Sequence, residues 1–137
     1  MFSGNKIIHT YSRSSALSEG EQVCLSKRFP EECKLYRYPV YCTRAVWELI
    51  ESAVNNSQAG NDYAGVVWDI IFMSIKSPGR KFLNKATSKF SVIVQGAYRI
   101  PNTYEDEMPI YHLVSQCGAS DIDNLSPCIT IMFPDEL

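Results

Sequence analysis

The strongest hydrophobic pattern in the sequence is the apolar segment from Tyr63 to Lys76, which predicts a helix. At 100° per residue, Gly65, Asp69 and Lys76 fall on one narrow polar strip. Most of the remaining surface is apolar and carries Val67, Trp68, Ile70, Ile71 and Ile75. We therefore expect a central helix that is buried nearly all round, capped by Asp62, with Asp69 paired to an arginine or a backbone amide.

A second helix is predicted from Thr43, its N-cap, to about Val54. Apolar positions recur there at helical spacing, at Val46, Trp47, Ile50 and Val54. Shorter elements are predicted before it: a strand at 6–11, a helix within 12–20, a strand within 21–26, a short helix from Pro30 and an extended segment at 38–42. In the second of these, Gly20 suits the left-handed position that follows a helix.

The C-terminal half predicts β-structure. In the segment 88–96, Phe90, Val92 and Val94 alternate with more polar residues, as in a strand with one buried face. Two further strands are predicted at 109–118 and 127–134, each preceded by turn-forming residues. These patterns favour a single α+β domain over residues 1–137, with the central helix packed on a C-terminal three-stranded antiparallel sheet.

Composition narrows the class further. The 137 residues match the usual size of one domain, and no segment reads as a secretory signal or a membrane span. The five cysteines form no C-x-x-C pair, and no zinc spacing links them to His9 or His112. We therefore expect a cytoplasmic protein with reduced, mostly buried thiols, no metal site and no cofactor; His112 is expected to be a hydrogen-bonded core residue.

Charge is distributed unevenly along the chain. No acidic residue lies between Asp69 and Glu105, and that interval contains Lys76, Arg80, Lys81, Lys85, Lys89 and Arg99. Phe82 and Phe90 lie among these bases, an arrangement that can stack on nucleobases while lysines contact phosphates. The basic segment 76–89 therefore predicts contact with nucleic acid or with an acidic protein surface, although such a charge run can also simply solvate a loop.

Four segments carry a resemblance to a known family: "IIHTYSRSSALSEG", "YPVYCTRAVWELIE", "VVWDIIFM" and "ITIMFPDE". They resemble, in order and spacing, a small domain family of bacteria, plasmids and phages with a "YSYTRAQAIEDG"-like start, a "VALTRAVW"-like segment and an "ITIMLPGED"-like end. To our knowledge this family has no assigned function. The resemblance implies a compact intracellular domain associated with mobile elements, and no reaction. The expectation of a macromolecular partner, nucleic acid or protein, rests on the charge pattern, and the sequence leaves open whether the chain forms a homo-oligomer.

A second, looser resemblance implies an enzyme. A strand with His9, a short helix, a glycine and a strand resemble the start of ADP-ribosyltransferase domains. The segments 86–88 and 105–107 are similar to the S-T-S and E-x-E elements of one branch, although Ala86 stands where that motif has serine. In such an enzyme Arg13 would hold the cofactor's phosphate and Glu107 would stabilise an oxocarbenium-like centre. The structural alternative for Glu107 is a solvated turn.

Overall fold

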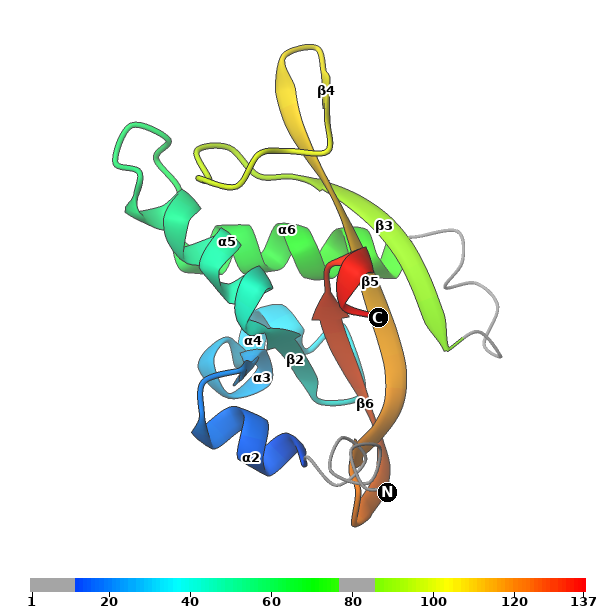
Figure 1. The fold of residues 1–137 in the computed structure, drawn as a ribbon. Coiled ribbons are helices and arrows are strands. Elements are labelled where there is room, and N and C mark those ends of the chain that lie inside the picture. Colours follow the sequence, from blue (N-terminus) through cyan, green and yellow to red (C-terminus); the bar gives the residue numbers. More distant parts are fainter. Residues whose placement is uncertain (1–11, 77–85) are drawn as a thin grey trace, which may run out of the picture.

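Helices and strands alternate in the first half of the chain, and strands dominate the second half (Figure 1). The computed structural model describes residues 12–76 and 86–137. Within them the α-helices are α2 (Arg13–Ser18), α3 (Leu25–Arg28), α4 (Pro30–Cys33), α5 (Arg44–Asn55) and α6 (Tyr63–Lys76). The strands are β1 (Gln22–Cys24), β2 (Val40–Thr43), β3 (Thr87–Ile93), β4 (Thr103–Glu105), β5 (Met108–Asp121) and β6 (Asn124–Met132), followed by a 3₁₀ turn, η2 (Pro134–Glu136). The predicted α+β class is confirmed.

The sheet is larger than the predicted three-stranded meander. Its order is β1-β2-β6-β5-β3, and β4 adds a short pairing to β5. The predicted antiparallel pairing of the three C-terminal strands is confirmed, since β5 lies between β3 and β6. The sheet is mixed because β2 pairs with β6 in parallel, with Val40 opposite Ile129. The strand predicted at 6–11 lies outside the described residues.

Local hydrogen bonds explain where the helices begin. The hydroxyls of Ser12 and Thr43 accept hydrogen bonds from the amides three residues on, at the starts of α2 and α5. The Asp62 carboxylate accepts one from the Gly65 amide at 2.8 Å, as predicted for α6. After α2, Gly20 has a φ of 78°, the left-handed conformation expected of a glycine that ends a helix.

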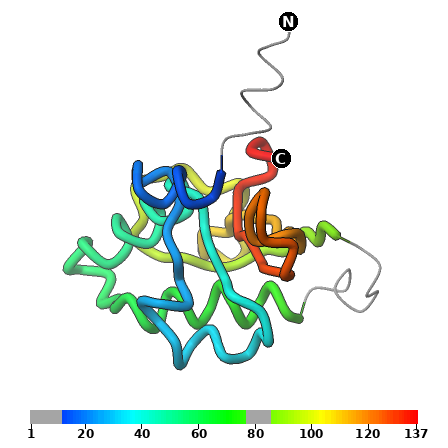
Figure 2. The backbone as a smooth tube through the Cα atoms, turned by 90° about the horizontal axis from the view of Figure 1, so that it is seen from below, coloured from blue at the N-terminus to red at the C-terminus, as the bar shows by residue number. Residues whose placement is uncertain are grey.

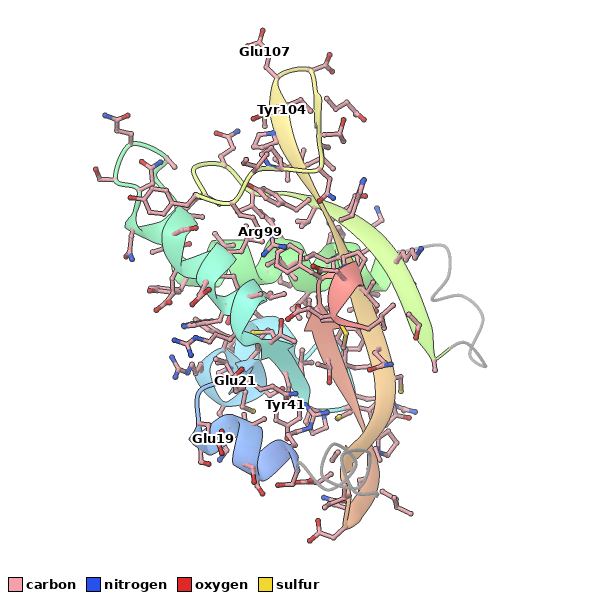
Figure 3. The ribbon with its side chains drawn as sticks, viewed as in Figure 1. Glu19, Glu21, Tyr41, Arg99, Tyr104 and Glu107 are labelled. Carbon is pink, nitrogen blue, oxygen red and sulfur yellow. The ribbon has the colours of Figure 1, made fainter. Side chains whose placement is uncertain are left out.

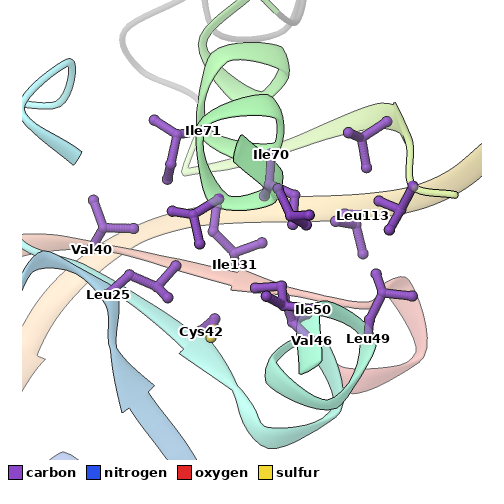
Figure 4. Packing of buried hydrophobic residues seen from close by; sticks show 14 of the residues in the cluster. Leu25, Val40, Cys42, Val46, Leu49, Ile50, Ile70, Ile71, Leu113 and Ile131 are labelled. Atoms are coloured by element: carbon purple, nitrogen blue, oxygen red, sulfur yellow. The ribbon is translucent and has the colours of Figure 1, made fainter. Parts of the chain in front are cut away.

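The core lies between one face of the sheet and the two long helices. Ile70 and Ile71 of α6 and Ile50 of α5 point toward Leu113 and Ile131 of the sheet (Figure 4). Each of these five side chains is fully buried. The predicted inward face of β3 is confirmed, because Phe90, Val92 and Val94 all belong to the same cluster.

The short helix α2 lies on the opposite side of the sheet from α6 (Figure 2). Its Arg13 contacts Thr130, which alternates along β6 with the core residues Ile129 and Ile131. Alternation along a strand places Thr130 on the face away from the long helices. The molecule therefore has a thick helical layer on one face and a small cover on the other.

The predicted all-round burial of α6 is wrong. Only one side of the helix is buried, through Val66, Val67, Ile70, Ile71 and Ser74. The opposite side is exposed and still carries three large apolar side chains, Trp68, Phe72 and Met73. The hydrophobic pattern could not separate the two sides, because residues of the same kind occupy both.

The prediction about His112 is corrected, and for Asp69 the described residues supply no predicted partner. His112 is exposed, because it alternates along β5 with Tyr111 and Leu113, which face the core. Its Nδ1 lies 2.9 Å from the Ser91 hydroxyl, so the predicted hydrogen bond is present at the surface. For Asp69, residues 12–76 and 86–137 supply no hydrogen bond or ion pair, and desolvation raises the pKa of its carboxyl. Among these residues, no helix has the length and hydrophobicity needed to cross a membrane.

Candidate functional site: the α6–β3 surface

Apolar side chains are exposed side by side along the outer face of α6 and the end of β3. Trp68, Phe72, Met73 and Ile93 are 41%, 40%, 38% and 41% exposed. Lysines and an acid border them, and we call the whole set the α6–β3 surface: Trp68, Asp69, Phe72, Met73, Lys76, Lys89 and Ile93. Clustered exposed apolar side chains on regular elements are typical of a binding surface.

A cavity of about 410 Å³ lies within this surface. Phe72 and Met73 line it from α6, and Ile93 lines it from β3. Asp69 and Glu105 also reach its wall, so the cavity is apolar with an acidic border. Its volume lies at the lower end of the range of roughly 300–1,000 Å³ that is typical of small-molecule pockets, and it is also large enough for one or two apolar side chains of a protein partner.

Aromatic contacts hold the exposed rings in place. The rings of Trp68 and Phe72 are 5.6 Å apart and nearly parallel, at 18°. The Lys76 ammonium lies 5.2 Å from the centre of the Phe72 ring, on the next turn of the helix. This row of Trp68, Phe72 and Lys76 is spaced at i, i+4 and i+8, so the helix backbone fixes its geometry. The surface is therefore preorganised before any partner binds.

β3 forms one edge of the sheet within the described residues. Amides of Val94 and Cys117 donate to the carbonyls of Pro109 and Ala86, which fixes the ladder between β3 and β5. Because antiparallel pairs alternate between hydrogen-bonded and non-bonded types, the backbone groups of Ser91 and Ile93 point away from β5. They face the edge of the sheet beside the cavity, where an additional strand could pair.

The predicted basic segment is only partly placed. Lys76 ends α6 and Lys89 lies in β3, and both side chains are exposed. Along β3 Lys89 alternates with Ser88 and Phe90, which are buried, so its side chain projects from the face of the strand away from the core. The other three predicted binding residues, Arg80, Lys81 and Lys85, lie outside the described residues.

Arg13, which the enzyme alternative assigns to a phosphate, has internal partners. Its guanidinium donates to the Ser120 carbonyl and to Gln22 Oε1 at 2.6 Å, and to Thr130 Oγ1 at 3.0 Å. It also lies over the Tyr41 ring, 4.2 Å from its centre. These contacts make Arg13 a clasp between α2 and the sheet, with little donor capacity left for a ligand.

Arg13 and Glu107 lie at opposite ends of β5. Figure 3 shows Glu107 at the tip of the β4–β5 hairpin and Tyr41, the partner of Arg13, near the other end. The strand between them has 14 residues, roughly 40 Å of chain at ~3.3 Å per residue. Asp106 and Glu107 have φ values of 51° and 66° and form the two-residue turn itself. The structure therefore does not bring these two predicted residues together, and His9 lies outside the described residues.

The cysteines of the described residues are unpaired thiols, most of them buried. All five are free thiols, and Cys33, Cys42 and Cys128 are buried. Burial raises the pKa of Cys33 to about 11 and also raises that of Cys42, so both thiols stay protonated at neutral pH. Residues 12–76 and 86–137 contain no group of three histidine, cysteine or acidic side chains placed to hold a metal ion.

A second exposed apolar feature lies in the connection between β3 and β4. Tyr98 and Ile100 are 94% and 86% exposed, and the guanidinium of Arg99 between them, also exposed, lies over the Phe133 ring, 3.6 Å from its centre. Tyr111 anchors the same segment by donating to the Arg99 carbonyl. We give this loop second place, because its apolar side chains lie on an irregular segment. Tyr98 does border a cavity of about 340 Å³, but Ile100 does not line it.

The sequence indicated the lysines of this surface and missed its aromatic half. Trp68, Phe72 and Met73 were assigned to the core or left unassigned, because hydrophobic residues in a helix normally indicate burial. One available signal was the size of the residues: Trp68 and Phe72 are large aromatics spaced at i and i+4, next to the strip of Gly65, Asp69 and Lys76 that was predicted to be polar. Large aromatics next to such a strip indicate a wider exposed face.

Comparison with known proteins identifies a family whose function is unknown. A family model described as a family of unknown function (DUF6573) matches residues 1–137. No curated protein and no solved structure matches the chain. The function must therefore be inferred from the site itself.

Proposed function

The chain belongs to DUF6573, a family of unknown function, and we propose that it is a non-enzymatic interaction protein that binds another protein chain through the α6–β3 surface. One observation carries the proposal: the exposed side chains of Phe72, Met73 and Ile93 line a cavity of about 410 Å³, and the exposed Trp68 ring stacks against Phe72. Apolar anchors in a preformed pocket, surrounded by charge, are typical of the centre of a protein interface.

Charge supports a partner that is acidic at one end of the contact. Lys76 and Lys89 border the surface where β3 begins, and the predicted basic residues Arg80, Lys81 and Lys85 belong to the connection between them. An acidic region of the partner would lie against this end, since rim charges mainly guide association and orientation. The apolar cavity would supply most of the affinity.

Nucleic acid is the second candidate partner. The stacked pair Trp68 and Phe72, with Lys76 beside it, resembles the base-stacking platforms of proteins that bind single strands. Asp69 and Glu105 line the same cavity and would repel a phosphate backbone. The net charge of −2 also gives no general attraction for nucleic acid. We therefore favour a protein partner.

The setting we propose is the cytoplasm of a bacterium that carries a plasmid, phage or prophage. This proposal rests on the resemblance of the segments quoted above to a family of such elements. The ADP-ribosyltransferase alternative would need Arg13 to leave its clasp and would need a different acid, because Glu107 lies at the far end of β5. We therefore propose a binding role and no reaction.

Capture experiments test the proposal. The tagged full chain is incubated with bacterial cytosol, with and without nuclease, beside the double variant Phe72→Ala/Met73→Ala. We expect a protein that is retained after nuclease treatment and lost with the double variant. The matched control is Tyr98→Ala/Ile100→Ala, which removes equally exposed apolar side chains from the other surface. If nuclease treatment abolished capture, nucleic acid would be the favoured partner. If only Tyr98→Ala/Ile100→Ala abolished capture, the binding surface would be the connection between β3 and β4.

A further inference from the structure

Charges of opposite sign lie at the two ends of the β3 edge. Figure 1 shows α6 ending and β3 beginning on the same side of the molecule, so Lys76 at the end of α6 lies toward the start of β3, the part of the strand that contains Lys89. Asp69, two turns earlier in α6, lines the cavity together with Ile93 at the end of β3, and Glu105 lines it as well. Phe72 and Met73 lie between the basic and the acidic ends.

Such an edge is complementary to itself. When two antiparallel copies of β3 pair about a two-fold axis, the start of one strand lies beside the end of the other. Lys76 and Lys89 of one copy then approach Asp69 and Glu105 of the second copy, and the same contacts form twice. The two Phe72 side chains fall near the axis, where an interface is normally apolar.

The backbone groups along the edge of β3 also favour the pairing of two β3 strands. The amide and carbonyl groups of Ser91 and Ile93 point away from β5, toward the edge. With the axis at Ser91, each Ser91 faces its counterpart, and Ile93 faces Lys89 of the second copy. An added strand would satisfy these groups and would continue the sheet across both copies.

We propose that the chain forms a symmetric dimer in which β3 pairs with β3 of a second copy and the two α6 helices pack through Phe72 and Met73. This inference rests on the proposed function, because it names the protein partner of the same α6–β3 surface. It also explains why Asp69 has no cation within the described residues: Lys76 of the second copy would supply one. The raised pKa of Asp69, caused by desolvation, is consistent with a carboxylate that lacks such a partner in the single chain.

Charge reversal tests the dimer directly. Sedimentation of the full chain is measured up to about 100 µM, where a dimer of micromolar affinity is largely assembled. We expect Lys76→Glu and Asp69→Lys each to raise the dissociation constant roughly tenfold, because each removes two symmetric attractions and creates repulsion. The double variant Asp69→Lys/Lys76→Glu restores complementarity and should restore the dimer. Lys27→Glu, the same kind of change at an exposed position of α3, is the matched control.

Amide hydrogen exchange provides a second readout that needs no variant. The Ser91 and Ile93 amides should become protected as concentration rises, while the Val92 amide, directed at β5, should be protected throughout. A chain that stays monomeric at about 100 µM would overturn the dimer. The proposed function would still stand if capture remained sensitive to Phe72→Ala/Met73→Ala. A dimer whose dissociation constant is unchanged by both Lys76→Glu and Asp69→Lys, or that leaves the Ser91 and Ile93 amides unprotected, would place the interface elsewhere and would also overturn the inference.

Discussion

The indole ring of Trp68 and the phenyl ring of Phe72 lie nearly parallel, 5.6 Å apart, on the exposed side of α6. One turn of helix separates them, and on the other side of the same helix Ile70 and Ile71 are completely buried. α6 therefore has two apolar faces, one buried and one exposed. The inner face stabilises the fold, and we propose that the outer face binds a partner.

Alanine substitutions should separate the two faces of α6. Ile71→Ala removes a fully buried side chain and should lower the free energy of unfolding by roughly 2–5 kcal/mol. Phe72→Ala removes a side chain that already contacts water, so its cost should stay below about 1 kcal/mol. Urea denaturation of both variants measures the difference. Equal losses of stability would mean that Phe72 belongs to the core and that the binding role is misplaced.

Arg13 should be a residue of the fold rather than of a cofactor site. Arg13→Ala deletes three side-chain hydrogen bonds and the contact with Tyr41, and should destabilise the protein by about 2 kcal/mol. Arg13→Lys should recover little, because an ammonium cannot reproduce the planar fork of donors. Thermal denaturation beside Arg37→Ala, an exposed control, checks this prediction. An unchanged melting temperature for Arg13→Ala would revive the assignment of Arg13 to a ligand.

Asp121 should make stability depend on pH. Its carboxylate accepts hydrogen bonds from the amides of Ile122, Arg13 and Ser14, and these bonds, the Ile122 bond first, lower its pKa in the folded protein. A pKa below the unfolded value of about 3.9 means that the stabilisation is fully present above that pH. It is lost as the pH falls through the folded pKa.

Asp121→Asn mimics the protonated carboxyl and tests this dependence. The wild-type chain should be more stable than the variant at pH 7, and the difference should shrink once the pH falls below about 4. Urea midpoints measured across this range give the comparison. A difference that stays constant with pH would show that the charge of Asp121 does not contribute.

The buried thiols should resist alkylation. Burial raises the pKa of Cys33 to about 11 and raises that of Cys42, so few of these thiols are ionised at pH 8. Cys24 and Cys117 are only partly buried. Iodoacetamide treatment of the native chain, followed by mass spectrometry, should label these two at least about tenfold faster. Rapid labelling of Cys42 would indicate local opening of the core near β2.

Much of the fold follows from local sequence signals. The bounds of α6, its Asp62 cap, the Thr43 cap of α5 and the inward face of β3 were all predicted, since each depends on neighbouring residues. The parallel pairing of β2 with β6 was not predicted. It joins segments about ninety positions apart in the chain, and no periodicity within either segment specifies such a partner.

The candidate site was predicted only in part, for a related reason. A charged side chain normally indicates an exposed position, so the exposure of Lys76 and Lys89 could be predicted. Trp68 and Phe72 carry no such signal, because the sequence does not distinguish an apolar side chain that packs in the core from one that is exposed for a partner. The internal contacts of Arg13 were likewise not predicted, since they join it to Ser120 and Thr130, more than a hundred residues away.

Site-specific photo-crosslinking in living cells tests most directly whether the α6–β3 surface binds a protein. A benzophenone amino acid replaces Phe72 in one version of the full chain and the exposed residues Tyr98 and Leu125 in two control versions. We expect irradiation to give a protein adduct from position 72 that survives nuclease, with a mass that identifies either a second copy or another chain. An adduct from position 98 or 125 with none from position 72, or an adduct from position 72 that nuclease removes, would contradict the binding of a protein at this surface.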